Sequence, residues 1–208
     1  MKNNETKKIF SIAIKLFTIC SIVAVIVAFV NGITKDRIIY NERISTAEAL
    51  SEIYSEDFGS KSFKVSGEEY IIKDDNGIIA KCVEAQVDEF TDDDITSLFV
   101  LTDRDGNDIG YCVAVQPMGF KDVIKMLVAV NPDLSVKGVK IISMSETSGI
   151  GTKAADESFL SQFKVKPAAE VNVISGATKT TKPVIGAVEG SVQQVTAYIN
   201  ITGGAANE

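Results

Sequence analysis

The sequence of 208 residues contains no histidine and no tryptophan. Without histidine, the chain has no Ser-His-Asp or Cys-His catalytic machinery, no histidine-ligated zinc or haem, and no imidazole to move protons near neutral pH. Its three cysteines, Cys20, Cys82 and Cys112, form no CxxC pair, so their spacing does not support an iron–sulfur or zinc site. We interpret them as small apolar side chains, with a Cys82–Cys112 disulfide as the alternative. Any redox chemistry therefore needs a bound cofactor.

Negative charge outweighs positive charge outside the first 35 residues. Those residues hold five lysines and one glutamate, a net charge of +4, so the remaining 173 must carry −11 for the chain to total −7. An acidic body argues against binding to nucleic acid and against adhesion of that body to an anionic membrane surface. Electrostatic attraction to lipid is confined to the N-terminal end.

A long apolar run lies close to the N-terminus. Leu16–Thr34 contains 19 residues without a charge, and about 20 are needed to cross the hydrocarbon core of a bilayer. Lys7 and Lys8 precede the run, so the positive-inside rule predicts a cytoplasmic N-terminus and export of the rest across the cytoplasmic (inner) membrane. A cleaved signal peptide is the alternative, but Val30-Asn31-Gly32-Ile33 does not resemble its small-residue cleavage site. We therefore expect an uncleaved single-pass anchor and an extracytoplasmic domain.

The rest of the chain predicts short strands followed by helices. Apolar stretches separated by turn signals such as Asp75-Asn76-Gly77 indicate antiparallel strands. The predicted strands are Phe63–Val65, Tyr70–Ile72, Ile79–Val87, Leu98–Leu101, Ile109–Val115, Asp122–Val130 and Val136–Ser143. Helices are predicted at residues 36–56, Ala154–Phe163 and Pro183–Ile199. Strands followed by separate helices indicate an α+β fold rather than a doubly wound sheet.

The last predicted helix has one apolar face, which we expect to pack on the sheet. Its residues recur every three or four positions: Val184, Val188, Val192, Val195 and Ile199. The expected organisation is a cytoplasmic N-terminus (1–8), a transmembrane helix (9–34), a connecting helix or linker (35–60), a folded domain (61–201) and a flexible tail (202–208).

Four hydroxyl side chains and a glycine lie at the expected start of that helix. The run is Ser175-Gly176-Ala177-Thr178, followed by Lys179-Thr180-Thr181. A helix start gathers unpaired backbone N–H groups and the positive end of the helix dipole, so it suits a phosphate. Taken alone, such a run is also a common helix cap.

A second segment of small residues follows a predicted strand. It reads Glu146-Thr147-Ser148-Gly149-Ile150-Gly151, and its glycines allow close approach of the backbone to a ligand. It lacks the GxxxxGK[ST] pattern of nucleoside-triphosphate sites. Taken alone, it would be a turn between a strand and a helix.

Together these two segments resemble the FMN-binding domains of the G subunit of the Rnf electron-transport complex and the C subunit of the sodium-pumping NADH:quinone reductase. In that family, the last threonine of a Ser/Thr-Gly-Ala-Thr signature carries FMN through a phosphoester bond, and that threonine is Thr178 here. Glu-Thr-Pro-Gly-Leu-Gly occupies the place of the earlier segment, with Ser148 and Ile150 replacing proline and leucine. The short body and single anchor are more similar to the Rnf protein. The resemblance covers the whole chain in layout, but only these two motifs sharply.

The resemblance implies that residues 61–201 bind FMN, with Thr178 as the site of covalent attachment. The other cofactor-binding residues that it implies are Ser175, Gly176, Ala177, Thr180, Glu146, Thr147, Gly149, Ile150 and Gly151. No residue is expected to be catalytic or to bind a metal. The acidic loop Asp103–Asp108 lacks the complete spacing of a calcium loop, so we interpret it as a polar hairpin turn.

Three departures from the family pattern are visible. Asn172 stands where an aspartate is frequent, and Thr181 stands where a serine often follows. A glycine-rich segment is reduced to Gly119-Phe120-Lys121, so one loop beside the flavin is expected to differ. None of these changes removes the acceptor hydroxyl.

As a member of that family, the chain would be an electron-relay subunit with no substrate turnover of its own. The Rnf complex moves electrons between ferredoxin and NAD, coupled to movement of Na⁺ or H⁺. Partners would be other Rnf-type membrane subunits, iron–sulfur subunits and a separate FAD-using flavin transferase, because no base beside Thr178 is recognisable. One alternative is a stand-alone membrane-anchored flavoprotein for extracellular electron transfer. Another is a non-redox anchored interaction domain, in which Ser175–Thr181 only caps a helix.

Overall fold

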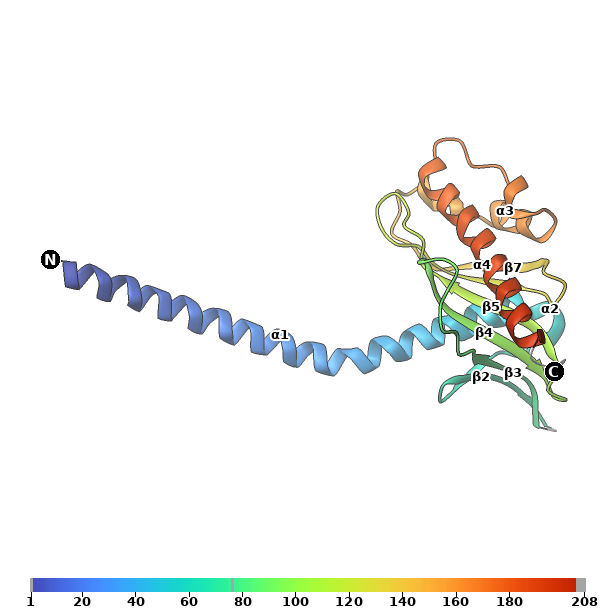
Figure 1. Ribbon diagram of the computed structural model, residues 1–208, viewed down its shortest axis with the longest axis horizontal. Helices are drawn as coiled ribbons and strands as arrows, with labels where there is room; N and C mark the ends of the chain where they lie inside the picture. Colours follow the sequence, from blue (N-terminus) through green and yellow to red (C-terminus); the bar gives the residue numbers. More distant parts are fainter. Residues whose placement is uncertain (1, 76, 205–208) are drawn as a thin grey trace. The chain divides into compact units, whose positions relative to one another are not determined.

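The computed structural model describes residues 2–75 and 77–204, and the chain divides into two compact units, Met1–Arg43 and Ile44–Glu208. The described residues of the first unit, 2–43, lie within one continuous helix, α1 (Lys2–Ile53) (Figure 1). Part of α1 is long and apolar enough to span a membrane, with a mean hydropathy of 2.6 in its most apolar window. Within it, the hydroxyls of Thr18 and Thr34 donate to backbone carbonyls one turn earlier, each at 2.8 Å. These polar groups are therefore satisfied inside the helix, as an apolar environment requires.

The second unit contains a seven-stranded antiparallel sheet in which strands adjacent in sequence are also adjacent in space (Figure 1). The strands are β1 (Lys64–Ser66), β2 (Glu69–Asp74), β3 (Gly77–Glu84), β4 (Ile95–Asp103), β5 (Asp108–Val115), β6 (Lys125–Val130) and β7 (Val136–Ser143). Short turns join β1 to β2, β2 to β3, β4 to β5 and β6 to β7, whereas longer loops, residues 85–94 and 116–124, join β3 to β4 and β5 to β6. In the β4–β5 turn, the Asp103 carboxylate accepts hydrogen bonds from the backbone N–H groups of Asp105 and Asn107, each at 2.9 Å. The predicted strands and this polar turn are confirmed; Asn76, in the predicted β2–β3 turn, lies outside the described residues.

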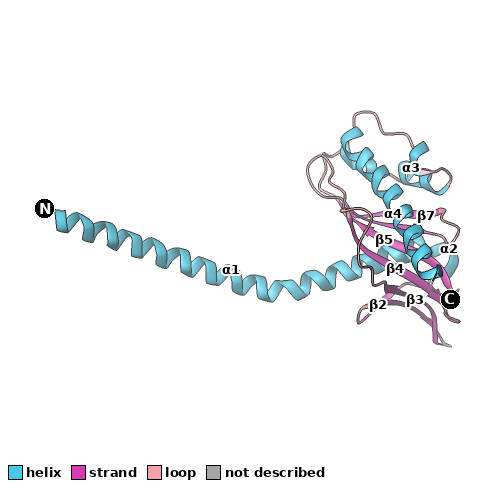
Figure 2. Ribbon diagram, viewed as in Figure 1, coloured by secondary structure: helices cyan, strands magenta, loops and turns pink. Residues whose placement is uncertain are grey.

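Side chains alternate between the two faces of the sheet, and each face has its own apolar core. On one face, Leu98, Val113 and Val128 are buried with residues of α4 (Thr178–Gly204). We call this the α4 side; Figure 2 shows α4 lying across the strands. On the other face, strand residues are buried with Leu50 and Tyr54, from the C-terminal end of α1 and the residue that follows it. We call this the α1 side, and the two layers of helix with the sheet between them confirm the α+β fold.

Helix α4 carries the predicted apolar face. Val184, Val188 and Val195 are fully buried, and Val192 and Ile199 pack against the same core. The helix begins at Thr178, before the predicted start at Pro183, so Pro183 lies inside the helix, where it has no N–H to donate to the Lys179 carbonyl one turn earlier. It continues to Gly204, and residues 205–208 of the expected tail lie outside the described residues.

The single helix predicted at Ala154–Phe163 is wrong. The chain instead forms short pieces: η1 (Gly151–Ala155), α3 (Glu157–Leu160) and η2 (Ser161–Lys164), with η3 (Ala168–Glu170) following and α2 (Ser55–Phe58) elsewhere. Asp156 interrupts the run with an extended backbone, φ −67° and ψ 136°. Phe159 and Phe163 still lie on one side and pack edge to face at 5.6 Å between ring centroids, so the apolar spacing reflected their burial rather than an unbroken helix.

The cysteines are free. Cys82 and Cys112 are fully buried on the α1 side, where β4 separates their strands β3 and β5. Two strand spacings and an offset in register separate their Cα atoms by more than about 9 Å, which is beyond the roughly 7 Å limit for a disulfide. The interpretation as buried apolar side chains is confirmed for Cys82 and Cys112, whereas Cys20 is exposed, and the disulfide alternative is wrong.

Candidate functional site

The two sequence motifs meet at one open pocket of about 550 Å³. Its walls come from the loop after β7, from the start of α4 and from the loop before β6. Eight of the predicted residues line it: Glu146, Thr147, Ile150, Gly151, Gly176, Ala177, Thr178 and Thr180. Thus segments 26 to 34 residues apart in sequence, as their hydrogen bonds show, form one site.

The loop after β7 is folded back on itself by its threonines. The Thr147 carbonyl accepts hydrogen bonds from the N–H groups of Ile150 at 3.2 Å and Thr152 at 3.3 Å. The Thr152 hydroxyl accepts one from the Gly149 N–H at 2.9 Å. Gly149 itself has φ +73°, a left-handed conformation that favours glycine. Gly149 does not line the pocket but shapes the turn that presents Ile150, whose side chain is 51% exposed.

The three threonines at the start of α4 have different environments. Thr180 and Thr181 are 2% and 0% exposed. The Thr180 hydroxyl donates to Glu146 Oε2 at 3.0 Å, and the Thr181 hydroxyl donates to the Ala177 carbonyl at 3.1 Å. Thr178 is exposed at the pocket, and its hydroxyl has no hydrogen-bond partner within the described part of the chain. Of the three hydroxyls, only that of Thr178 is therefore available to a ligand.

The first backbone amides of α4 are also available. The Ala177 carbonyl accepts the N–H groups of Thr180 and Thr181, each at 2.9 Å. Among residues 2–75 and 77–204, no acceptor pairs with the N–H of Thr178 or Lys179, as is usual for the first residues of a helix. Gly176, with φ +83°, makes the turn that precedes them, while Ser175 is exposed and does not line the pocket. The arrangement gives an anion two unpaired donors and the positive end of a long helix dipole.

Glu146 connects the three walls of the pocket. Its Oε1 accepts hydrogen bonds from the backbone N–H groups of Phe120 at 2.8 Å and Lys121 at 3.0 Å, while Oε2 accepts the bond from Thr180. Burial by itself would raise the pKa of Glu146, but the bonds from Lys121, Thr180 and Phe120 outweigh it and lower the pKa below its usual value. The carboxylate is therefore ionised at neutral pH. We call Glu146, Phe120, Lys121 and Thr180 the Glu146 cluster.

Two glycines make room for that carboxylate. A Cβ on Gly151 would stand 2.7 Å from Glu146 Oε2 and 3.1 Å from the Thr180 hydroxyl. A Cβ on Gly119 would collide with Oε1 and would lie 2.9 Å from the Asp122 carbonyl. The contacts with Glu146 are shorter than real Cβ atoms tolerate, so the backbone can approach this carboxylate so closely only where no side chain is present.

Two pocket residues lie outside the predicted set. Phe120 is 56% exposed, and the Lys179 ammonium lies 5.2 Å from its ring centroid in a cation–π contact. The sequence marked the shortened segment Gly119-Phe120-Lys121 as a loop that differs, but no spacing assigned the ring to the pocket. An aromatic ring and an aliphatic side chain, Ile150, thus join the polar groups that line the pocket.

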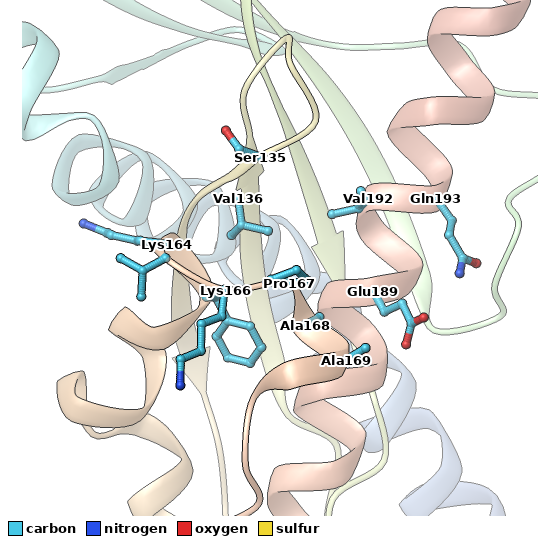
Figure 3. A pocket seen from close by; sticks show the side chains of 12 residues that line it. Ser135, Val136, Lys164, Lys166, Pro167, Ala168, Ala169, Glu189, Val192 and Gln193 are labelled. Atoms are coloured by element: carbon cyan, nitrogen blue, oxygen red, sulfur yellow. The ribbon is translucent and has the colours of Figure 1, made fainter.

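A second cavity of about 510 Å³ lies elsewhere on the α4 side (Figure 3). Its lining is mostly apolar and includes Val136, Pro167, Ala168 and Val192. Figure 3 shows these side chains between the β7 strand and α4, with the Lys164 side chain extending away from them. None of the predicted site residues lines this cavity, so the predicted chemistry belongs to the first pocket.

Comparison with known proteins gives a family match to the region that holds the pocket. Residues 119–193 match the family described as the FMN-binding domain, and this range contains every residue that lines the first pocket. This part of the chain is similar to an FMN-binding domain. The resemblance inferred from the two motifs is confirmed at this level.

Two relatives extend the comparison beyond the FMN-binding domain. The G subunit of the proton-translocating ferredoxin:NAD(+) oxidoreductase complex of Clostridium ljungdahlii is 38% identical over 108 residues, which cover 46% of this chain and 57% of the relative. The match thus spans little more than half the length of that relative. The G subunit of the Na(+)-translocating ferredoxin:NAD(+) oxidoreductase complex of Acetobacterium woodii is 26% identical over 208 residues, covering 95% of this chain and 91% of the relative.

Among solved structures, the chain is similar to the crystal structure of NqrC from Shewanella oneidensis. The sequences are 28% identical, the match covers 50% of this chain and 59% of that chain, and the TM-score is 0.42. A TM-score of this size does not establish a common fold. The similarity to the FMN-binding domain rests on the family match to residues 119–193.

Proposed function

We propose that this chain carries FMN, bound through a phosphoester to the Thr178 hydroxyl, and relays electrons as the G subunit of a membrane-bound ion-translocating ferredoxin:NAD oxidoreductase. The observation that carries the attachment site is the difference between the three threonines of one helical turn. The hydroxyls of Thr180 and Thr181 are buried and hydrogen-bonded, whereas Thr178 is exposed at the pocket and its hydroxyl has no partner among the described residues. The names of the two relatives support the role in electron transport.

The residues of the pocket fit the two ends of FMN. The unpaired N–H groups of Thr178 and Lys179, with the dipole of the 27-residue helix α4, suit a phosphodiester carrying one negative charge. The exposed side chains of Phe120 and Ile150 supply apolar surface for a flat aromatic ring. When bound, the flavin would supply reversible one- and two-electron chemistry, which none of the chain's own side chains offers.

Attachment needs a second protein, because a threonine hydroxyl is a weak nucleophile without a base and none of the described residues bonds to the Thr178 hydroxyl. A flavin transferase that uses FAD would supply that base. The Thr178 oxygen would form the ester bond to the FMN phosphorus, the pyrophosphate bond of FAD would break, AMP would leave, and the hydroxyl proton would pass to the transferase. The exposure of Thr178 gives such an enzyme access to the oxygen.

The proposed place of the domain is the extracytoplasmic side of the cytoplasmic membrane, with the apolar part of α1 as a single-pass anchor. A covalent bond suits that location, since a dissociated flavin could not be replaced from the cytosolic pool. The other membrane and iron–sulfur subunits of the complex would be its partners.

The attachment site is tested by coexpressing the chain with a flavin transferase and measuring flavin fluorescence of the denatured protein in a gel. We expect Thr178→Ala to abolish the fluorescent band and Thr178→Ser to retain it, because serine keeps the hydroxyl. Thr202→Ala, an exposed threonine at the other end of α4, is the control and should remain as bright as the wild type. A Thr178→Ala band of wild-type brightness contradicts the attachment site. Copurification of integral-membrane subunits would separate the complex from a stand-alone flavoprotein.

A further inference from the structure

We propose that Glu146 is a positioning residue: its carboxylate fixes the first turn of α4 against the loop at Phe120 and Lys121, and so presents the Thr178 hydroxyl for attachment. The resemblance to the family had placed Glu146 among the residues that contact FMN. The structure places both of its oxygens on the protein itself. The part of this inference that concerns attachment rests on the proposed function, whereas the part that concerns the arrangement of the pocket does not.

Hydrogen bonds within the protein occupy most of the acceptor positions of the Glu146 carboxylate. A carboxylate has about four acceptor positions, and Glu146 uses three of them, on Phe120, Lys121 and Thr180. The three donors belong to two segments that the chain separates widely, and both segments line the pocket. Hydrogen bonds to an ionised acceptor are about twice as strong as those between neutral groups. A single side chain thus connects every wall of the site.

Thr180 connects Glu146 to the turn of α4 that contains Thr178. It lies two positions after Thr178 in the first turn of α4, and its side chain is 2% exposed. Its hydroxyl donates to Glu146, while its N–H donates to the Ala177 carbonyl. Because both groups are fixed, the turn cannot rotate without breaking the bond to Glu146. The position of the Thr178 hydroxyl follows from the position of that turn.

The close approach of Gly119 and Gly151 indicates that the cluster is built into the backbone rather than formed on ligand binding. Each glycine lies where a Cβ would overlap a different oxygen of the Glu146 carboxylate. Glycine at both positions leaves room for the carboxylate between the two backbone segments. Three hydrogen bonds, from Phe120, Lys121 and Thr180, hold it there, so the protein's own groups arrange this part of the pocket.

Two variants distinguish the bonds of Glu146 to the loop at Phe120 and Lys121 from its bond to Thr180 in α4. Glu146→Gln keeps the shape of the side chain but removes the negative charge that strengthens all three hydrogen bonds, so it weakens the bonds to the loop at Phe120 and Lys121 as well as the bond to α4. Thr180→Val keeps the volume of the side chain but removes the hydroxyl, so it removes only the hydrogen bond between Glu146 and α4. Glu189→Gln, the same loss of charge on an exposed part of α4, is the control.

The first measurement is hydrogen–deuterium exchange of the full chain in detergent, without flavin. We expect Glu146→Gln to accelerate exchange in peptides that contain residues 119–122 and 176–181, with exchange in β6 unchanged. Thr180→Val should accelerate exchange in the second region alone. Wild-type exchange in both regions of Glu146→Gln would overturn the proposal whether or not the chain carries FMN.

The second measurement is the rate of flavin attachment by a transferase supplied with FAD, followed by mass spectrometry. Each variant weakens or removes a hydrogen bond to a charged group, and the free energy of such a bond corresponds to a factor of about ten or more. If that bond positions the Thr178 hydroxyl, we expect both variants to lower the maximal rate of attachment by about tenfold or more. The transferase concentration for half-maximal rate should change less, and Glu189→Gln should behave as the wild type. Attachment to Glu146→Gln at the wild-type maximal rate would refute the positioning role. Continued attachment to Thr178→Ala would instead refute the proposed attachment site.

Discussion

Both sides of the sheet place a polar side chain directly against a glycine, but the two sides use that contact differently. On the α4 side, Glu146 lies over Gly151 and accepts three hydrogen bonds from segments that line an open pocket. On the α1 side, the Tyr54 hydroxyl stands 2.5 Å from the position of a Cβ on Gly110 and contacts Cys112 Sγ at 3.7 Å. The first contact joins loops around a site, whereas the second lies within a packed core.

The two sides of the sheet are expected to contribute differently to stability and to the candidate site. On the α1 side, Tyr54, Phe58 and Phe63 pack at 6.1–6.3 Å between ring centroids, and none of them lines the pocket at the start of α4. On the α4 side, the pocket depends on a few directed bonds at the end of an apolar core. Substitutions on the α1 side should therefore change the free energy of unfolding most, and those around Glu146 should change the site most.

The largest expected effect on stability is that of Leu50→Ala on the α1 side. Leu50 is 0% exposed and packs with the strand core, so removing it should lower the free energy of unfolding by about 2–5 kcal/mol. Chemical denaturation of the full chain measures this change. Ile201→Ala, a side chain 75% exposed near the end of α4, should change it by less than about 0.5 kcal/mol. Equal effects of the two variants would show that residues 44–53 do not form part of the core.

A smaller effect is expected at Gly151 on the α4 side. The added Cβ of Gly151→Ala would stand 2.7 Å from Glu146 Oε2 and 2.8 Å from Glu146 Cβ, so the carboxylate or the loop must move, at a cost of about 1–3 kcal/mol. Gly186→Ala is the matched control, because no atom lies within 4 Å of its added Cβ and it is helical. That change should stabilise the chain by about 0.5–1 kcal/mol. A neutral Gly151→Ala would mean that Glu146 is free to turn away.

The sequence predicted the strands of the sheet well because each strand is a run of apolar residues bounded by polar turns or loops. In β6, for example, Met126 and Val128 face α4 while Leu127 and Ala129 face α1. Four of the six connections are short turns, which make the strands that they join antiparallel neighbours. The helix predicted at Ala154–Phe163 failed because apolar spacing reports burial, not backbone continuity. Asp156 interrupts the helix without disturbing the core spacing.

The site was predicted in part, for a similar reason. The motifs named most of the residues that line the pocket, since small residues and hydroxyls are recognisable at a helix start. The signature singled out Thr178, but no sequence pattern shows that Thr178 is exposed while Thr180 and Thr181 are buried, because their environments depend on packing against segments such as the loop at Glu146, 32 to 35 positions earlier in the chain. Nor does any local signal bring Phe120 to the pocket, since a single exposed aromatic residue has no periodicity.

The smallest expected effect is that of the Tyr54–Gly110 contact on the α1 side. Burial, together with the neighbouring Cys112, raises the pKa of Tyr54, so its hydroxyl is neutral at all physiological pH values and Tyr54→Phe loses only a weak bond to sulfur, about 0.5–1 kcal/mol. Gly110→Ala alone should cost more, because the new Cβ would meet the hydroxyl at 2.5 Å and the ring carbon Cζ at 3.5 Å. In the Tyr54→Phe background the hydroxyl is gone and the nearest ring atom lies at an ordinary contact distance, so the cost of Gly110→Ala should fall. A double-mutant cycle by chemical denaturation measures this coupling. Strictly additive effects would show that the glycine is required for some reason other than the phenol oxygen, and the parallel with Glu146 and Gly151 would then fail.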